Sequence, residues 1–356
     1  MNISNIDANF RVDTNLDKAD IQWMDPGKKP FSLFGVLQTE GGYMRMQPEI
    51  GEKVSESVAL LNRHTSGGRV SFETNSPYVA IHAKCGQTRS AVMPATGYGG
   101  FDLYLEEKDG LRFTNVFVPP LDVEKAYEGI YHFREEAPRK VLIHFPLYSS
   151  VEFLAIGIQQ GSTVSPYSPY GNDMPVVFYG SSITQGGCVS RPGNAYPAVF
   201  SQLTRRNYIN LGFSAGAHGE EEMARYIANL PMSLFVMDYD HNDCDNLSRL
   251  AERHPAFYRI VRERNPMLPI VIMSAPYAAR TFYESHPMKS KGILKDTYFL
   301  AKEAGEPVAF IDGYEIFGAE KDAALADRIH PNDLGHWKMA NALIQCVGSM
   351  QRSLIR

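Results

Sequence analysis

Residues 175–184 read Pro175-Val176-Val177-Phe178-Tyr179-Gly180-Ser181-Ser182-Ile183-Thr184. A short apolar run that ends in glycine and serine is typical of a buried strand followed by a tight turn. Helix-like and strand-like segments alternate after it, at 196–206, 208–211, 220–229, 233–237, 247–264, 269–273, 289–303, 308–311 and 332–350. Strands that alternate with helices predict a parallel sheet with helices on both faces, so residues 175–356 are expected to form a three-layer α/β/α domain.

The first part of the chain follows a different pattern, in which short β-rich runs are separated by Gly, Pro and Asn. These runs lie at 69–74, 78–83, 101–105, 112–118, 140–145 and 151–158. Several short strands with turn signals between them predict a β-sandwich or jelly-roll domain over residues 1–165, which could help to shape a substrate cleft. The segment 166–174, rich in Ser, Pro and Gly, is expected to be the linker.

The composition excludes several classes of protein. The 356 residues are 44% hydrophobic and carry 35 Lys+Arg against 40 Asp+Glu, which argues against disorder and against a basic nucleic-acid-binding surface. No apolar run is long enough to cross a bilayer, and residues 1–7 lack the pattern of a secretory signal. The four cysteines lie far apart without a CxxC pair, as expected for reduced thiols. We therefore expect a cytoplasmic protein with neither a nucleic-acid nor a membrane partner.

Ser182 is the first candidate for chemistry. A serine directly after a buried strand projects its hydroxyl at the carboxyl edge of the sheet, where ligands bind in such folds. The N–H groups at the start of the following helix would favour an anion nearby. The same residues also fit a plain Gly/Ser-rich turn or a phosphate-binding loop without its lysine, and the G-x-S-x-G elbow of α/β-hydrolases is absent.

Three further segments supply partners for a serine nucleophile. Asp327 and His330 lie three residues apart, as a base and the carboxylate that orients it would. Gly212 and Asn242 follow two of the expected strands, where a backbone N–H and a side-chain amide could stabilise an oxyanion. The acidic cluster around Asn242 lacks the spacing of metal ligands, so no metal is expected; it comprises Asp238, Asp240, His241 and Asp243.

In this order and spacing, the four segments resemble the SGNH (GDSL-like) hydrolase superfamily, whose four blocks contribute Ser, Gly, Asn and His. The resemblance spans about residues 175–350 and ends in a close match, Asp-x-x-His-Pro-Asn, at 327–332. It implies that Ser182, His330 and Asp327 are catalytic, and that the N–H groups of Ser182 and Gly212 and the Asn242 amide form the oxyanion hole. It implies no metal or organic cofactor.

Two residues depart from the family pattern. Ser181 replaces the usual Asp before the nucleophile, which should not abolish the chemistry because the catalytic carboxylate is in the last block. Asp240 replaces the usual Gly of the third block, where it could reshape the acyl pocket or bind a substrate hydroxyl. In the first half, residues 100–104 match the Gly-x-Asp-Leu-Tyr motif of a β-domain that precedes some SGNH domains.

The resemblance implies a serine esterase acting on short acyl esters, above all acetyl esters on a sugar, with a small-molecule or oligosaccharide substrate. One alternative is a lipid or thioester acylhydrolase of the same superfamily. Another, from a different class, is a carbohydrate-binding protein without catalysis. The oligomeric state is left open, and a homo-oligomer is compatible with the sequence. His64 is expected on a surface loop, although it could reach the site from the β-domain.

Overall fold

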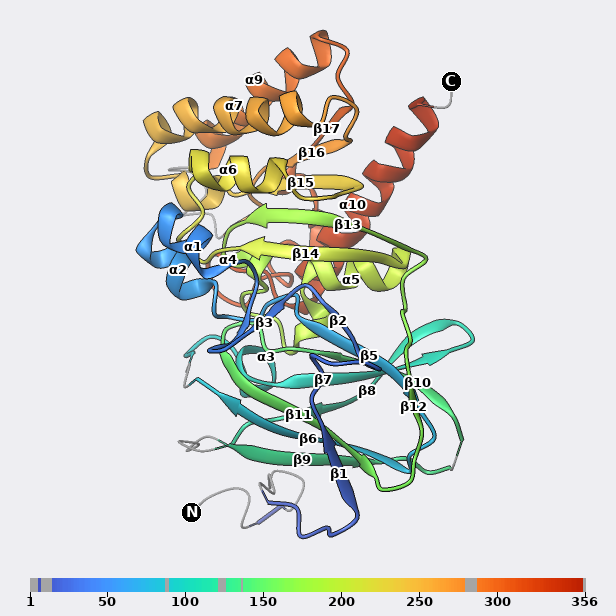
Figure 1. Cartoon of the computed structure of the whole chain (residues 1–356). Helices are drawn as coiled ribbons and strands as arrows, with labels where there is room; N and C mark the ends of the chain where they lie inside the picture. Colours follow the sequence, from blue (N-terminus) through green and yellow to red (C-terminus); the bar gives the residue numbers. More distant parts are fainter. Residues whose placement is uncertain are drawn as a thin grey trace.

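The computed structural model describes residues 6–7, 15–86, 90–120, 126–135, 137–278 and 287–354. Figure 1 shows a β-rich part, which contains the N-terminus, below a part in which helices flank a sheet. Among the helices of the described residues, none combines the length and apolar character that a membrane span requires.

The first part is built from two antiparallel sheets, as the β-rich runs predicted. One has the order β1 (Ile21–Met24), β11 (Val151–Gln159), β6 (Tyr78–Cys85) and β9 (Tyr127–His132). The other has the order β12 (Val164–Ser165), β5 (Arg69–Thr74), β10 (Arg139–His144), β7 (Phe101–Glu107) and β8 (Gly110–Phe117), with β2 (Ser32–Phe34) also on β5. Alternate side chains of both sheets share one apolar core, which includes Phe72, Ile81, Leu103, Ile143 and Ile156. A small hairpin, β3 (Leu37–Thr39) and β4 (Gly42–Met44), and a short helix, α3 (Ala95–Tyr98), complete this part.

The second part confirms the three-layer α/β/α architecture. Its sheet is parallel, in the order β14 (Arg206–Gly212), β13 (Asn172–Gly180), β15 (Leu234–Asp238), β16 (Ile270–Met273) and β17 (Val308–Ile311). The core on one face includes residues of α5 (Tyr196–Thr204) and α10 (Asp333–Leu354). The core on the other face includes residues of α6 (Glu221–Ala228), α7 (Leu247–Arg264) and α9 (Pro287–Glu303). From β13, the chain continues to β14 on one side and then to β15 on the other, so the direction of strand addition reverses between β13 and β15. Sheets of this class bind ligands in the crevice at such a reversal.

Two short helices of the first half were not anticipated from the sequence. They are α1 (Pro48–Val54) and α2 (Glu56–Leu61), and Figure 1 shows them beside α6. Met46 and Val58 are fully buried in the same apolar cluster as Phe213 and Ile227 of the second half. The core of the α/β part is therefore completed by side chains from the first 61 residues.

The Gly-x-Asp-Leu-Tyr segment lies at the junction of the two parts. Asp102 on β7 is 0% exposed, and its Oδ2 accepts the N–H of Gly193 at 2.7 Å. Gly193 belongs to the 3-10 turn Pro192–Asn194 that precedes α5. His144 Nδ1 of β10 lies 2.9 Å from Asp102 Oδ1. Gly193 has no room for a side chain, because a Cβ there would lie 2.3 Å from Tyr104 Oη. The motif thus joins the β-rich part to the loop that follows the nucleophile segment.

Candidate active site

Ser182 is the first residue of the short helix α4 (Ser182–Gln185), directly after the central strand β13. Ser181 caps this helix, because its hydroxyl accepts the N–H of Ile183 at 3.2 Å. Serine and aspartate both serve as N-caps, so Ser181 can supply the same acceptor as the aspartate usual at this position. Ser182 is largely buried, with a residue exposure of 7%.

The structure brings Ser182, His330 and Asp327 into one hydrogen-bonded chain. Ser182 Oγ lies 2.9 Å from His330 Nε2, and His330 Nδ1 lies 2.9 Å from Asp327 Oδ2. Asp327 Oδ1 accepts the N–H groups of Ile329 and His330, both at 2.7 Å. Partial burial acts to raise the pKa of the Asp327 carboxyl, but hydrogen bonds from His330 and Ile329 outweigh it and hold that pKa below its usual value. The carboxylate is therefore ionised at neutral pH and can orient the imidazole.

The residues after His330 fix the loop that carries it. Asn332 Oδ1 accepts the N–H of Leu334 at 3.0 Å and so caps α10, while its Nδ2 donates to the Ala323 carbonyl at 2.7 Å. One turn later, His336 Nδ1 accepts the N–H of Tyr196, and His336 Nε2 lies 3.1 Å from the carbonyl oxygen of Gly187. The start of α10 thus positions both His330 and the loop that follows the nucleophile.

Gly212 has a packing role in this structure. Its N–H, which was assigned from the sequence to the oxyanion hole, donates to Asn210 Oδ1 at 2.9 Å. A Cβ at Gly212 would lie only 2.2 Å from the Gln185 nitrogen. The residue therefore allows α4 to pack directly against β14, and its N–H is already engaged.

Asn242 lies on a single turn of 3-10 helix, Asp240–Asp243, that follows β15. Its Nδ2 donates to the carbonyls of Phe213 and Ala217, at 3.1 and 3.0 Å. Asn242 thereby ties the end of β15 to the loop that follows β14.

That loop contains Ala215, which sequence reasoning missed. Its φ is +51°, in the left-handed region where a residue with a Cβ is strained by about 1–3 kcal/mol. The preceding residue, Ser214, donates its N–H to Gln185 Oε1 on the nucleophile helix at 3.0 Å. Within the part of the chain that the structure describes, the N–H groups of Ser182 and Ala215 have no protein acceptor. An alanine carries no signal of positive φ, so its type gave no reason to single it out.

Side chains from the β-rich part, among them Ser66, Tyr148 and His64, reach the nucleophile helix. Tyr148 Oη donates to the Ser182 carbonyl at 3.0 Å. His64 Nδ1 lies 3.4 Å from Gln185 Nε2, so His64 faces α4 and does not occupy the surface position expected from the sequence. Burial and the positive charge of Arg45 lower the pKa of His64 to about 4, which keeps its imidazole neutral.

The two acidic residues after Met237 turn away from solvent. Asp238 accepts hydrogen bonds from Thr184 Oγ1 and from Tyr196 Oη at 2.7 Å, and burial raises its pKa to about 8. Asp240 accepts the Ser290 hydroxyl of α9 at 3.0 Å, and burial raises its pKa to about 6. Asp240 therefore directs its carboxylate to α9, and Asp238 anchors the nucleophile turn.

Among the residues that the structure describes, one group of side chains could hold a metal ion. Cys188, Asp327 and His330 place a thiol, a carboxylate oxygen and an imidazole nitrogen within 4.8 Å of one another. The Asp327 and His330 atoms are hydrogen-bonded to each other, so a metal there would have to break the chain that links His330 to Asp327.

Comparisons with known proteins show what each part of the chain is similar to. Residues 173–348 match the GDSL-like lipase/acylhydrolase family, and residues 21–164 match the N-terminal domain of SGNH-hydrolase-type esterases that is named for its GxDLY motif. No curated protein matches the sequence significantly.

Solved structures extend the similarity over nearly the whole chain. A putative GDSL-like lipase from Bacteroides ovatus superposes with a TM-score of 0.84 at 23% identity, over 93% of this chain and 98% of that one. Salicylyl-acyltransferase SsfX3 from a tetracycline biosynthetic pathway gives 0.78 at 20% identity, over 94% and 98%. A family two carbohydrate esterase from Cellvibrio japonicus gives 0.62 at 10% identity, over 94% and 99%. At these identities, the structural matches establish the shared two-part fold.

Proposed function

Because the chain belongs to the GDSL-like (SGNH) lipase/acylhydrolases that carry a GxDLY N-terminal domain, we propose that it is a serine esterase using Ser182, His330 and Asp327. The observation that carries the proposal is the hydrogen-bonded chain from Ser182 Oγ through His330 to Asp327, with 2.9 Å at each link. A serine hydroxyl becomes a competent nucleophile when an imidazole within this distance accepts its proton.

The proposed reaction has two steps. His330 takes the Ser182 proton as Oγ attacks the ester carbonyl, and Asp327 stabilises the imidazolium that forms. His330 then gives the proton to the departing alcohol, which leaves an acyl group on Ser182. Water, deprotonated by His330, attacks this acyl-enzyme and releases the carboxylic acid, so the serine is regenerated.

We assign the oxyanion hole to the N–H groups of Ser182 and Ala215, with the Asn242 amide as a third donor. Ala215 takes the place proposed from the sequence for Gly212, whose N–H is held by Asn210 Oδ1 at 2.9 Å. The Asn242 amide donates to the Phe213 and Ala217 carbonyls and so supports the loop around Ala215. When substrate is bound, this amide gives up one of the two carbonyls and donates a hydrogen bond to the oxyanion instead. Asn242→Ala is expected to lower kcat on the order of a hundredfold, as is usual on removal of an oxyanion donor.

The substrate we favour is an acetyl ester of a sugar. Gly187 packs closely against the nucleophile, since a Cβ on it would lie 3.0 Å from the Ser182 carbonyl oxygen and 3.2 Å both from His330 Cδ2 and from Tyr148 Oη. We take this close packing beside Ser182 as support for a small acyl group rather than a long chain. The sugar is suggested by structural neighbours described as carbohydrate esterases, of which one was solved with cellohexaose.

The test compares hydrolysis of p-nitrophenyl acetate, butyrate and octanoate by wild type, Ser182→Ala and Ser248→Ala. Ser248 is exposed on α7 and serves as the matched serine control. We expect acetate to be the best substrate and Ser182→Ala to lose roughly a thousandfold or more, with Ser248→Ala unchanged. Undiminished hydrolysis by Ser182→Ala would refute the serine mechanism.

The remaining outcomes separate the alternatives. A preference for octanoate would favour the lipid or thioester acylhydrolase. Release of acetate from acetylated xylo-oligosaccharides would support the sugar ester. An added alcohol that captures the acyl group would indicate acyl transfer, the activity in the name of the SsfX3 neighbour. No turnover of any ester would favour a carbohydrate-binding protein without catalysis.

A further inference from the structure

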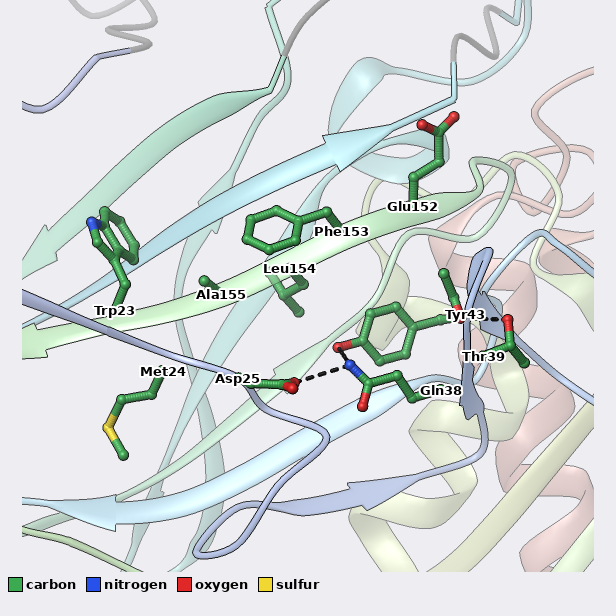
Figure 2. A pocket seen from close by; sticks show the side chains of 11 residues that line it. Trp23, Met24, Asp25, Gln38, Thr39, Tyr43, Glu152, Phe153, Leu154 and Ala155 are labelled. Carbon is green, nitrogen blue, oxygen red and sulfur yellow. Dashed lines mark hydrogen bonds between the residues drawn. The ribbon is translucent and has the colours of Figure 1, made fainter.

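A second pocket lies in the β-rich part, between the hairpin β3–β4 and the strands β1 and β11. It has a volume of about 360 Å³. Figure 2 shows polar side chains of Asp25, Gln38 and Tyr43 on one side and rings of Trp23 and Phe153 on the other. It shares no lining residue with the chain from Ser182 to Asp327.

The polar side is held in place before any ligand binds. Asp25 Oδ1 accepts the N–H of Gly27 at 2.9 Å and the side-chain amide of Gln38 at 3.0 Å. The same Gln38 nitrogen lies 3.5 Å from Tyr43 Oη, whose side chain is only 3% exposed. A Cβ on Gly27 would lie 1.7 Å from Gln38 Oε1, so glycine is needed there for Gln38 to adopt this position. A carboxylate, an amide and a phenol therefore form one fixed set of donors and acceptors.

The aromatic side is a row of rings on the outer face of the β1–β11–β6 sheet. Phe153 is 47% exposed, and its ring packs edge-on against His82 at 5.3 Å between centroids. His82 in turn packs edge-on against Trp23 at 5.6 Å. Trp23 lies over Gly157, where a Cβ would be 2.7 Å from the indole. Gly157 on the neighbouring strand β11 thus leaves the space that the Trp23 indole occupies.

The charges around the pocket are balanced. Asp25 Oδ2 lies 3.6 Å from Lys28 Nζ, and Glu152 Oε2 lies 2.7 Å from Lys84 Nζ. Each carboxylate of the lining thus has a lysine beside it, so the net charge around the pocket is zero. The pocket consequently favours a neutral ligand with many hydroxyl groups.

From these features we infer that the pocket is a non-catalytic carbohydrate-binding site, which holds one neutral sugar unit of a glycan chain. A pyranose ring has apolar C–H faces, which match Trp23 and Phe153, and an edge of hydroxyls, which match Asp25 and Gln38. The volume lies at the lower end of the 300–1,000 Å³ typical of small-molecule sites, as suits a single sugar unit. The proposal does not depend on ester hydrolysis, since binding needs neither Ser182 nor His330.

The test measures binding of unacetylated hexaoses by isothermal titration calorimetry. The ligands are the neutral β-linked hexaoses of glucose, xylose and mannose, and the protein carries Ser182→Ala so that the catalytic hydroxyl is absent. We expect at least one hexaose to bind, and Phe153→Ala and Gln38→Ala each to weaken its Kd about tenfold or more. Phe299→Ala is the matched control, because Phe299 is 52% exposed on α9 and is not part of the pocket.

Two results would overturn the inference. One is that none of the three hexaoses binds at millimolar concentration. The other is binding that Phe153→Ala and Gln38→Ala leave unchanged although both variants unfold at the temperature of the parent. A companion measurement on the protein with Ser182 intact separates the two proposals: Phe153→Ala should leave hydrolysis of p-nitrophenyl acetate unchanged. Failure of the esterase assay alone would not affect the binding result.

Discussion

Replacing Asp102 by alanine is expected to weaken the junction between the two parts of the chain. The carboxylate is 0% exposed and accepts the Gly193 N–H at 2.7 Å, with His144 Nδ1 at 2.9 Å on its other oxygen. Alanine would leave a buried N–H and a buried imidazole without this partner. Each buried polar group left without a partner usually costs about 1–3 kcal/mol, so the loss of both contacts is expected to cost about 3–5 kcal/mol in all.

The expected change in thermal stability follows from the size of the chain. With an unfolding entropy of about 2.1 cal/mol/K per residue over 356 residues, a loss of about 3–5 kcal/mol lowers Tm by roughly 4–7 °C. Differential scanning calorimetry at neutral pH measures this shift. Asp109→Ala is the matched control, because Asp109 lies in the exposed turn between β7 and β8 and its loss should move Tm very little.

A double-mutant cycle tests whether the two side chains act together. If Asp102 and His144 stabilise each other, the two alanine substitutions should differ from additivity by about 0.5–3 kcal/mol. A Tm within one degree of wild type for Asp102→Ala would refute the reasoning. Strict additivity in the cycle would show that the two residues act separately.

Three further predictions concern the site and its support. Asp327→Asn should lower kcat on p-nitrophenyl acetate roughly a thousandfold or more with little change in Tm, and a loss below tenfold would count against the orienting role. Gly212→Ala should cost about 1–3 kcal/mol in urea unfolding, because its Cβ would lie 2.2 Å from the Gln185 nitrogen; a neutral effect would show that α4 can move away. Burial raises the pKa of Asp240 from 3.8 to about 6, so the folded state binds the proton more tightly than the unfolded state. The ionised carboxylate therefore costs up to about 3 kcal/mol above pH 6, and this cost disappears as the pH falls towards 4. At pH 8, Asp240→Asn should unfold at a higher urea concentration than wild type, and at pH 4 this difference should disappear. An equal difference at both pH values would contradict a raised pKa of Asp240.

The sequence could predict the three-layer architecture of the second part, and also that Ser182, His330 and Asp327 lie close together. Both features depend on the order of strands along the chain. Parallel strands bring their carboxyl ends to one edge, so residues that follow different strands converge there without any detailed knowledge of packing. The order of the four blocks along the chain contained that information. Asp327 and His330 also lie within one turn, where local backbone geometry brings their side chains together.

The features that were missed depend on packing between distant segments. Helices α1 and α2 span only seven and six residues, too short for a clear helical period, and α/β core residues far along the chain stabilise them. At Gly212, the residue type does not distinguish a close approach of two backbones from a free N–H donor, so the sequence could not show that Asn210 accepts its N–H. The position of Tyr148 against Ser182 depends on how the two parts meet, which neither sequence pattern contains.

The burial of Met46 and Val58 in the core of the α/β part has a consequence for biosynthesis. Their partners on α6 are translated about 170 residues later, which at about 5–20 residues per second is a delay on the order of ten to thirty seconds. During that time, Met46, Val58 and the apolar residues around them have left the ribosome without the residues that cover them. A nascent chain of this protein therefore exposes these apolar side chains to chaperones until the second part is made and α6 packs against them.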